Sequence, residues 1–224
     1  MIDRRLEVQR LGRFDYARGL ELQAELESRV IKDRSCEYLI LLEHPHTFTL
    51  GRRSSGGVLA TAETLKALGI DVYEINRGGR VTYHGIGQIV GYPVISLSPD
   101  REDVHRYVRD LEEVLIRTMA DFDIDSFRIK GLTGVHTNEG KVAAIGVHIK
   151  RWVTTHGFAL NVSTDLSYYN WIIACEGEPV TTMERLLGHE IDLAVVESRI
   201  IENFVEVFGF EFVAGNGQNG ISVA

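Results

Sequence analysis

A long stretch, residues 141–162, constrains the fold most, because strand-forming residues fill nearly all of it. Its sequence, KVAAIGVHIKRWVTTHGFALNV, predicts two antiparallel strands that turn near Arg151-Trp152. Helical patterns lie on both sides: residues 101–121 carry apolar side chains on one face, and residues 181–187 and 191–208 return to helix. Helices and strands therefore do not alternate strictly. This order favours an α+β fold over a doubly wound parallel sheet.

The N-terminal half mixes both patterns as well. Loose helical spacing predicts a helix over 14–30, and a Thr start with a Gly stop predicts a short one over 61–69. Strands are expected over 36–43, 71–77 and 88–97. No repeat or linker-like composition divides the chain. We therefore expect a single domain over 1–213, with a mixed or antiparallel sheet and flanking helices, followed by a flexible tail over 214–224.

Composition excludes several classes of protein. With 24 basic and 32 acidic residues the net charge is −8, which disfavours a general nucleic-acid-binding protein. No apolar run approaches the ~20 residues of a membrane span, and charged residues occupy the place of a signal peptide's apolar stretch. Two cysteines, Cys36 and Cys175, cannot form a disulfide framework. They fit a reducing, cytoplasmic setting.

Glycine- and histidine-rich motifs do not match nucleotide or metal sites. Gly140-Lys141 resembles the end of a Walker loop, but Val135 stands where that loop needs glycine, and no Ser or Thr follows the lysine. The segment from Gly85 is followed by a strand pattern, so it is not a dinucleotide fingerprint. His44-Pro-His46 could place two imidazoles on one face of a strand. Without further ligand spacing, histidines hydrogen-bonded to backbone are the favoured interpretation, and no metal is expected.

Residues 77–88, RGGRVTYHGIGQ, form a segment dense in polar groups between two expected strands. Adjacent glycines at 78 and 79 would let the backbone approach a ligand closely. Arginines flank them, and the remaining hydrogen-bonding groups are Thr82, Tyr83, His84 and Gln88. Composition alone supports a binding loop and a solvated hairpin turn equally well.

Cys175 is the candidate nucleophile, although a lone cysteine is most often a small buried apolar residue. A reactive thiol needs a positive neighbour or a base, and Lys141 and His156 are the candidate partners. Cys36 lies inside an apolar strand pattern and is a much weaker candidate.

Taken together, these segments resemble the bacterial lipoyl(octanoyl) transferase family. The most specific is the 77–88 run. The others are EHPHTFTLGR (43–52), GKVAAIG (140–146), WVTTHGFALNV (152–162), TDLS (164–167) and Cys175. They cover roughly residues 5–210 in the family's order. The resemblance implies the α+β fold shared with biotin and lipoate protein ligases.

The resemblance also implies a reaction and its partners. Members transfer an octanoyl group from octanoyl-acyl carrier protein to one lysine of a lipoyl domain, through a cysteine thioester and without a cofactor. The implied acceptors are the lipoyl domains of 2-oxoacid dehydrogenase E2 subunits and the glycine cleavage H protein; no nucleic acid or membrane takes part.

By position, the family's nucleophile falls on Cys175 and its paired lysine on Lys141, and we expect His84 to orient substrate or assist proton transfer. The implied substrate-lining residues are Arg77, Gly78, Gly79, Arg80, Val81, Thr82, Tyr83, His84, Ala144, Ile145, Gly146, Gly157, Phe158 and Ala159.

Two departures from the family pattern lie near the expected site. Ala174-Cys175-Glu176 replaces the usual Pro-Cys-Gly, and we expect Glu176 to affect the rate more than the chemistry. His136 stands where tryptophan often follows Gly-Val, which makes one wall of the site more polar. We also expect the basic residues to gather at the site entrance, where an acidic carrier protein would dock. These are Arg52, Arg53, Arg80, Lys150 and Arg151.

Four other functions remain open. The nearest is an ATP-dependent lipoate or octanoate ligase of the same fold, which would not need Cys175. The others are a transferase between two lipoyl domains, a thiol hydrolase using Cys175 with His156, and an acyl-binding module without catalysis.

Overall fold

Two β-sheets form the centre of the molecule in a computed structural model that describes residues 5–54, 56–173, 178–210 and 221–223. Within these residues the larger sheet has seven strands, in the order β10-β1-β2-β6-β9-β8-β7. Their bounds in chain order are β1 Arg5–Arg13, β2 Cys36–Glu43, β6 Gln88–Val94, β7 Val135–Thr137, β8 Gly140–Lys150, β9 Val153–Asn161 and β10 Ile221–Val223. Only β1 and β2 are parallel neighbours in this sheet as described, so the sheet is mixed.

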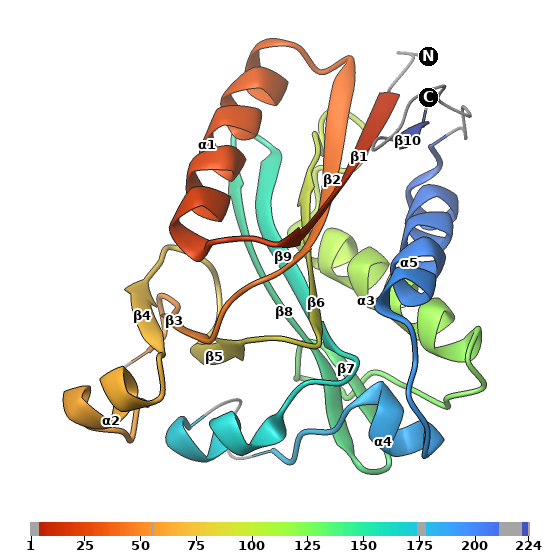
Figure 1. Ribbon diagram of the computed structural model, residues 1–224. Helices are drawn as coiled ribbons and strands as arrows, with labels where there is room; N and C mark the ends of the chain where they lie inside the picture. The colour runs from red at the N-terminus through yellow and green to blue at the C-terminus, as the bar shows by residue number, and fades with distance from the viewer. Residues whose placement is uncertain (1–4, 55, 174–177, 211–220, 224) are drawn as a thin grey trace.

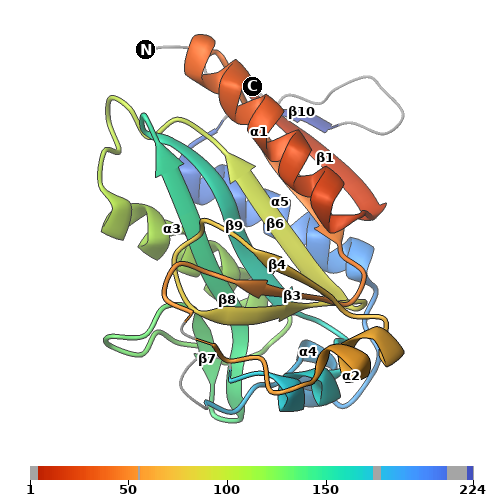
Figure 2. The ribbon, with the colours of Figure 1, turned by 90° about the vertical axis from the view of Figure 1, so that its left-hand side faces the viewer.

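The smaller sheet has the order β4-β3-β5, with bounds β3 Thr47–Leu50, β4 Asp71–Glu74 and β5 Val81–His84. Figure 2 shows its strands crossing those of the large sheet. The helices are α1 Tyr16–Lys32, α2 Ala62–Ala67, α3 Val104–Ala120, the 3₁₀ helix η1 Leu166–Trp171, α4 Met183–Leu187 and α5 Leu193–Phe208.

The large sheet separates two layers. Helices α3 and α5 cover one face, while α1 and the small sheet lie on the other (Figure 1). The α3–α5 side holds the larger apolar core, in which Leu111 and Phe204 are fully buried. The α1 side holds a second core around Leu26 and Val30, packed on alternate residues of β2 and β6. Both faces of β2 and β6 are therefore buried, which is why these strands are continuous apolar runs in the sequence.

The α+β class, the flanking helices and the long antiparallel pair are confirmed. Strands β8 and β9 pair over eight residues each, from Ala143 with Leu160 to Lys150 with Val153. Arg151 and Trp152 form the tight turn, with φ of 51° and 63°. Helix α1 begins two residues later than the pattern predicts, because the Asp15 side chain accepts a hydrogen bond from the Arg18 N–H and caps the helix.

Besides β10, four strands are not predicted from the sequence: β1, β3, β5 and β7. Three of them are four residues or shorter, too short for a periodic pattern. In β1, Leu6 and Val8 alternate with polar residues, but exposed charged residues dominate its second half. Residues 221–223 form β10 beside β1, within the segment expected to be flexible. The rest of that segment, 214–220 and 224, lies outside the described residues.

Candidate active site

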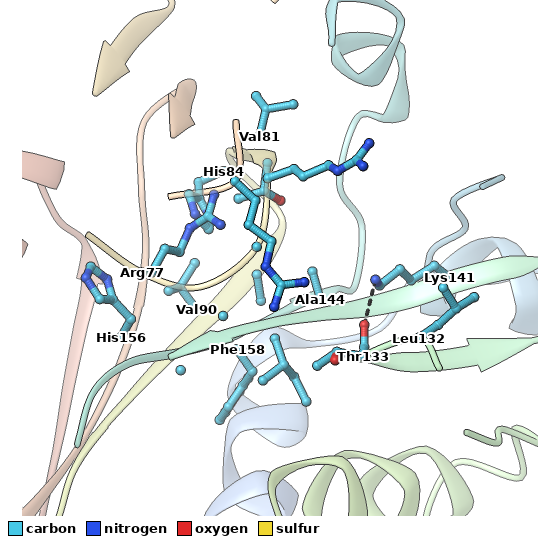
Figure 3. Close-up of a pocket in the computed structure, with 18 of the residues that line it drawn as sticks. Arg77, Val81, His84, Val90, Leu132, Thr133, Lys141, Ala144, His156 and Phe158 are labelled. Carbon is cyan, nitrogen blue, oxygen red and sulfur yellow. Dashed lines mark hydrogen bonds between the residues drawn. The ribbon is translucent and has the colours of Figure 1, made fainter. Parts of the chain in front are cut away.

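A pocket of about 280 Å³ lies between the two sheets. The hairpin of β8 and β9 forms its floor, strand β5 and the loop before it form the opposite wall, and α1 and β6 close one end. Figure 3 shows Lys141 and His156 at opposite ends, with Ala144 and Phe158 between them. Apolar residues line the pocket between these ends and beside Lys141, among them Val81, Val90, Leu132 and Ala159. A short acyl chain suits such a centre, because its burial is favourable by roughly 0.8 kcal/mol per methylene.

Most of the expected substrate-lining residues meet in this pocket. Those that line it are Arg77, Gly79, Arg80, Val81, Thr82, His84, Ala144, Ile145, Gly146, Gly157, Phe158 and Ala159, and the expected catalytic Lys141 lines it as well. Gly78 and Tyr83 are not among the lining residues. Side chains alternate along β5, so Tyr83 points away from the pocket and stacks on Tyr168 of η1. The Gly78 N–H donates to the Val147 carbonyl, which ties the 77–80 loop to β8.

Lys141 lies at one end of the pocket and is 6% exposed. Its Nζ donates to the Thr133 carbonyl at 2.7 Å (Figure 3). The chain after η1 returns alongside β8 here: the Lys141 N–H donates to the Pro179 carbonyl, and the Thr181 N–H donates to the Lys141 carbonyl. Gly140 makes this approach possible, since a Cβ at that position would lie 2.5 Å from the Pro179 oxygen. The Gly-Lys pair is therefore explained by packing against the returning chain rather than by a phosphate.

Arg77 is buried, and hydrogen bonds to β3 hold its guanidinium in place. Its Nη2 donates to the Thr49 carbonyl at 2.8 Å and to Thr49 Oγ1 at 2.7 Å. Nη1 donates to the Gly78 carbonyl. A Cβ on Gly51 would lie 2.8 Å from Nη1 and 2.6 Å from the Gly79 oxygen. Glycine at 51 and arginine at 77 thus hold the wall of the pocket in place, so the 77–88 segment is more than a solvated turn.

Three buried histidines lie toward the other end of the pocket: His84 and His156 line it, and the His44 ring centroid lies 5.9 Å from that of His84. Burial lowers the pKa of His84 to about 3, and the pKa values of His44 and His156 to about 4. The Arg77 charge lowers the pKa of His84 and His156 further. All three imidazoles are neutral at pH 7. His84 is consequently a poor proton acceptor, and its hydrogen bond with Gln88 Oε1 at 2.8 Å suits an orienting role better.

His44 and His46 form hydrogen bonds rather than an evident metal site. His44 Nδ1 lies 2.7 Å from the Phe14 carbonyl and its Nε2 lies 2.7 Å from the Tyr92 hydroxyl. His46 Nδ1 lies 2.8 Å from the Tyr83 hydroxyl. Among the described residues no group of three or more His, Cys, Asp or Glu side chains could hold a metal ion.

Cys175 and Glu176 lie outside the described residues. Cys36 is half-buried at the start of β2, where burial raises the pKa of its thiol and leaves it unactivated. Of the expected basic cluster, Arg53 and Arg80 line the pocket. Lys150 instead bonds Glu27 of α1 at 3.3 Å, and Arg151 lies in the β8–β9 turn. The cluster is therefore smaller than the sequence suggests.

Several residues that line the pocket are not predicted from the sequence: Tyr16, Val90, Tyr92, Gly131, Leu132, Thr133 and Glu178. Arg53 is expected only at the entrance, and His156 only as a partner of Cys175. Val90 and Tyr92 are two apart on β6 and so share a face. Because both faces of β6 are buried, the alternation does not reveal which one meets the pocket. The 131–133 loop and Glu178 carry no local signal at all.

Known proteins match this chain over nearly its whole length. The family described as Lipoyl protein ligase A/B catalytic domain matches residues 15–205. An octanoyltransferase of Solibacter usitatus is 48% identical over 210 residues, covering 93% of this chain and 95% of the relative. The chain belongs to the lipoyl(octanoyl) transferase family. A second relative, an octanoyltransferase of Rubrobacter xylanophilus, is 46% identical and covers 91% of this chain and 94% of its own.

Solved structures agree on the fold. A bipartite lipoate protein ligase of Thermoplasma acidophilum aligns with a TM-score of 0.72 at 18% identity, over 97% of this chain and 88% of its own. A biotin protein ligase of Aquifex aeolicus aligns with a TM-score of 0.52 at 11% identity, over 90% of this chain and 69% of its own. The expected biotin and lipoate ligase-like fold is confirmed. Membership of the family makes the chain an acyltransferase that transfers an octanoyl group in protein lipoylation.

No helix in the part of the chain that the structure describes is long and apolar enough to cross a membrane.

Proposed function

We propose that the chain transfers an octanoyl group from octanoyl-acyl carrier protein to a lysine of a lipoyl domain, through a thioester on Cys175. The acceptors are the lipoyl domains of 2-oxoacid dehydrogenase E2 subunits and the glycine cleavage H protein. The observation that carries the proposal is the position of Lys141, a buried amine at one end of an acyl-sized pocket. An amine there can hold a thiolate at the carbonyl end of the chain and exchange protons with both substrates.

The chemistry proceeds in two steps. In the first, the Cys175 thiolate attacks the donor thioester; the new C–S bond forms, the old one breaks, and the carrier thiolate leaves with a proton from Lys141. Both ends are thioesters, so the free-energy change is small. In the second, neutral Lys141 takes a proton from the incoming lysine ammonium, and the free amine attacks the acyl-enzyme. Amide formation is downhill, so neither ATP nor a metal is required.

The pocket contributes position as well as charge. The apolar centre between Ala144 and Phe158 holds the alkyl chain, and the 77–84 wall confines it. Backbone N–H groups facing the carbonyl would stabilise the oxyanion by roughly 3–4 kcal/mol per donor. The strand carrying Ala144, Ile145 and Gly146 is our proposed source of these donors. His84 is proposed to orient the substrate, in keeping with its neutral imidazole.

The decisive experiment is an intact mass spectrum after mixing the protein with octanoyl-acyl carrier protein in the absence of ATP. We expect one added octanoyl group on the wild type, none on Cys175→Ser, and discharge of the wild-type adduct by a lipoyl domain. Cys36→Ser is the matched control and should acylate normally.

The same assay separates the other functions. Transfer only with ATP and free acid, surviving in Cys175→Ser, would replace the proposal with a ligase. Discharge to water without a lipoyl domain would indicate a hydrolase. Charging by an octanoylated lipoyl domain but not by the carrier protein would indicate transfer between domains.

Donor docking is proposed to use Arg53 and Arg80, which are exposed and line the pocket. Acyl carrier proteins are acidic, so the attraction should be screened as ionic strength rises. We expect KM for the carrier to increase several-fold between about 0.05 and 0.5 M salt, and less so in Arg53→Gln. A salt-independent KM would exclude this docking mode. We further propose that the protein acts in the cytoplasm, where a cysteine nucleophile stays reduced.

A further inference from the structure

A buried histidine and a carboxylate that the proposed function does not use lie beside Lys141. His136 on β7 pairs directly with Lys141 on β8, so the two side chains are cross-strand neighbours. Its imidazole is 2% exposed, and neither ring nitrogen has a hydrogen-bond partner among the described residues. Nε2 lies 3.6 Å from Glu178 Oε2, which is likewise buried without a partner. Buried polar atoms are normally satisfied, so this pair needs an explanation.

Glu178 faces the pocket, and the backbone fixes its position. It directly precedes Pro179, whose carbonyl accepts from the Lys141 N–H at 2.8 Å. Its side chain keeps 19% of its surface exposed and lines the pocket at the Lys141 end. His136 does not line the pocket and stands behind the carboxylate. The order from the pocket inward is therefore carboxylate, then imidazole.

Proton balance shows why a second acceptor is needed. An incoming lysine ammonium carries three N–H protons and the amide product keeps one. Two protons must therefore leave the nitrogen. Lys141 is deprotonated when the carrier thiol departs, so it can accept one of these protons before the amine attacks. The second proton leaves the positively charged nitrogen of the tetrahedral intermediate, when Lys141 is already protonated.

We propose that Glu178 accepts this second proton and shares it with His136. The C–N bond forms, the C–S bond breaks with the electron pair on the cysteine sulfur, and the proton passes to the carboxylate–imidazole pair before reaching solvent. Once the proton is on the imidazole, the pair, now 3.6 Å apart, would close into a charge-assisted hydrogen bond. Glu178 is thus a catalytic residue and His136 a positioning residue that stabilises the proton behind it. The inference rests on the proposed function.

Charges on every element packed around His136 fit this role. Burial and the neighbouring Lys141 charge lower the pKa of His136, so the imidazole is neutral before the proton arrives. Glu178 and, from α3, Glu112 oppose that shift and favour the imidazolium once a proton arrives. Glu112 is itself neutralised by Arg109 and Arg128 at 3.1 Å each, so of these two carboxylates Glu178 is the one without an arginine partner among the described residues.

The test separates acylation from discharge. Glu178→Gln and His136→Gln are charged with octanoyl-acyl carrier protein, and discharge to a lipoyl domain is followed in a single turnover between pH 6 and 9. We expect acylation rates within about two-fold of the wild type. Discharge should fall about 100-fold in Glu178→Gln at pH 7, within the range typical of general-base groups. It should fall about 10-fold in His136→Gln, and both losses should shrink as pH rises.

Two controls make the same substitutions outside the pocket. Glu139→Gln removes an exposed carboxylate of the β7–β8 turn that pairs with Arg185, and His105→Gln removes an exposed imidazole on α3. Both should discharge normally. Thermal unfolding of all variants checks the fold. In Glu178→Ala, which leaves space for a small carboxylate, added formate should restore discharge by replacing the missing base.

Wild-type discharge rates and an unchanged pH profile in Glu178→Gln would overturn the inference while leaving the proposed function intact. Loss of acylation equal to loss of discharge would also overturn it, because the pair would then act on the nucleophile or on folding. A wild type that forms no acyl-enzyme would overturn both.

Discussion

Replacing Glu112 with glutamine tests how the fold holds the Lys141 end of the pocket. The Glu112 side chain is buried on α3; its Oε1 accepts from the Gly134 N–H at 3.1 Å. Its Oε2 accepts from Arg109 Nη1 and Arg128 Nε, each at 3.1 Å. Glutamine keeps one oxygen for Gly134 but turns an NH₂ group toward both guanidinium groups, so two charge-assisted bonds are lost.

The magnitude follows from those two bonds. A hydrogen bond to a charged group contributes roughly 1.5–3 kcal/mol. Arg109 is 54% exposed and Arg128 29% exposed, so water replaces part of the loss and we expect about 2–3 kcal/mol. At ~2–4 °C per kcal/mol for a chain of this size, Tm should fall by about 4–12 °C.

Glu113→Gln is the matched control, because it is the next residue on the same helix and also pairs with Arg128. Its side chain is 34% exposed, and pairs of this kind contribute less than ~1 kcal/mol. Urea unfolding followed by fluorescence gives both free energies, provided the slope with denaturant stays constant. Equal losses in the two variants would refute the reasoning.

Catalytic activity should also fall more in Glu112→Gln than in Glu113→Gln. Gly134 follows Thr133, whose carbonyl accepts the Lys141 Nζ hydrogen bond. Glu112→Gln weakens the contacts that hold the 133–134 loop, so the Lys141 amine is less firmly positioned. We therefore expect kcat to fall several-fold in Glu112→Gln and to stay unchanged in Glu113→Gln. A stability loss with unchanged kcat would show that the loop does not position the lysine.

Three further predictions concern the pocket walls. Gly157→Ala places a Cβ 2.2 Å from the backbone oxygen of Gly91 on β6, which cannot rotate away. The free energy of unfolding should fall by about 1–3 kcal/mol, and acylation should be slower even at temperatures below Tm. An unchanged urea midpoint would contradict this prediction. His44 has a pKa lowered to about 4, so the unfolded chain binds more protons below pH 6.5 and stability falls as pH falls. Between pH 7 and 5, His44 should account for a loss of about 2 kcal/mol in the free energy of unfolding. His44→Gln should therefore make stability less dependent on pH, and identical slopes in the two proteins would exclude this contribution. Thr49→Val removes the hydroxyl, one of the two Thr49 groups that accept hydrogen bonds from Arg77. The free energy of unfolding should fall by about 1–2 kcal/mol, and KM for the donor should rise with little change in kcat. A lower kcat at constant KM would argue against a purely positional role for Arg77.

The sequence was sufficient for the elements with long patterns. The α3 helix shows its apolar face at helical spacing, and the β8–β9 hairpin shows long strand runs around one tight turn. The 77–88 and 140–146 motifs pointed to one site through their resemblance to a family, and the structure brings most of their residues to one pocket. The roles of those residues in catalysis stay predictions.

Other features depend on contacts between residues far apart in the chain, so no local pattern reveals them. Strands β3 and β5 are short and form a sheet only because they pair with each other, with β4 on the other side of β3. The Glu178 side chain becomes a neighbour of Lys141 and His136 only when the chain after η1 returns alongside β8, whereas His136 reaches Lys141 through the β7–β8 pairing.

Local composition determined the helices and the strands with long apolar patterns, since backbone preference and apolar periodicity act over a few residues. Tertiary structure alone decided which side chains share the pocket and which imidazoles are held neutral. Burial and charge proximity depend on what the rest of the fold places against each group. Lys141 shows both sides: its motif was visible in the sequence, but its carbonyl acceptor and its acidic neighbour were not.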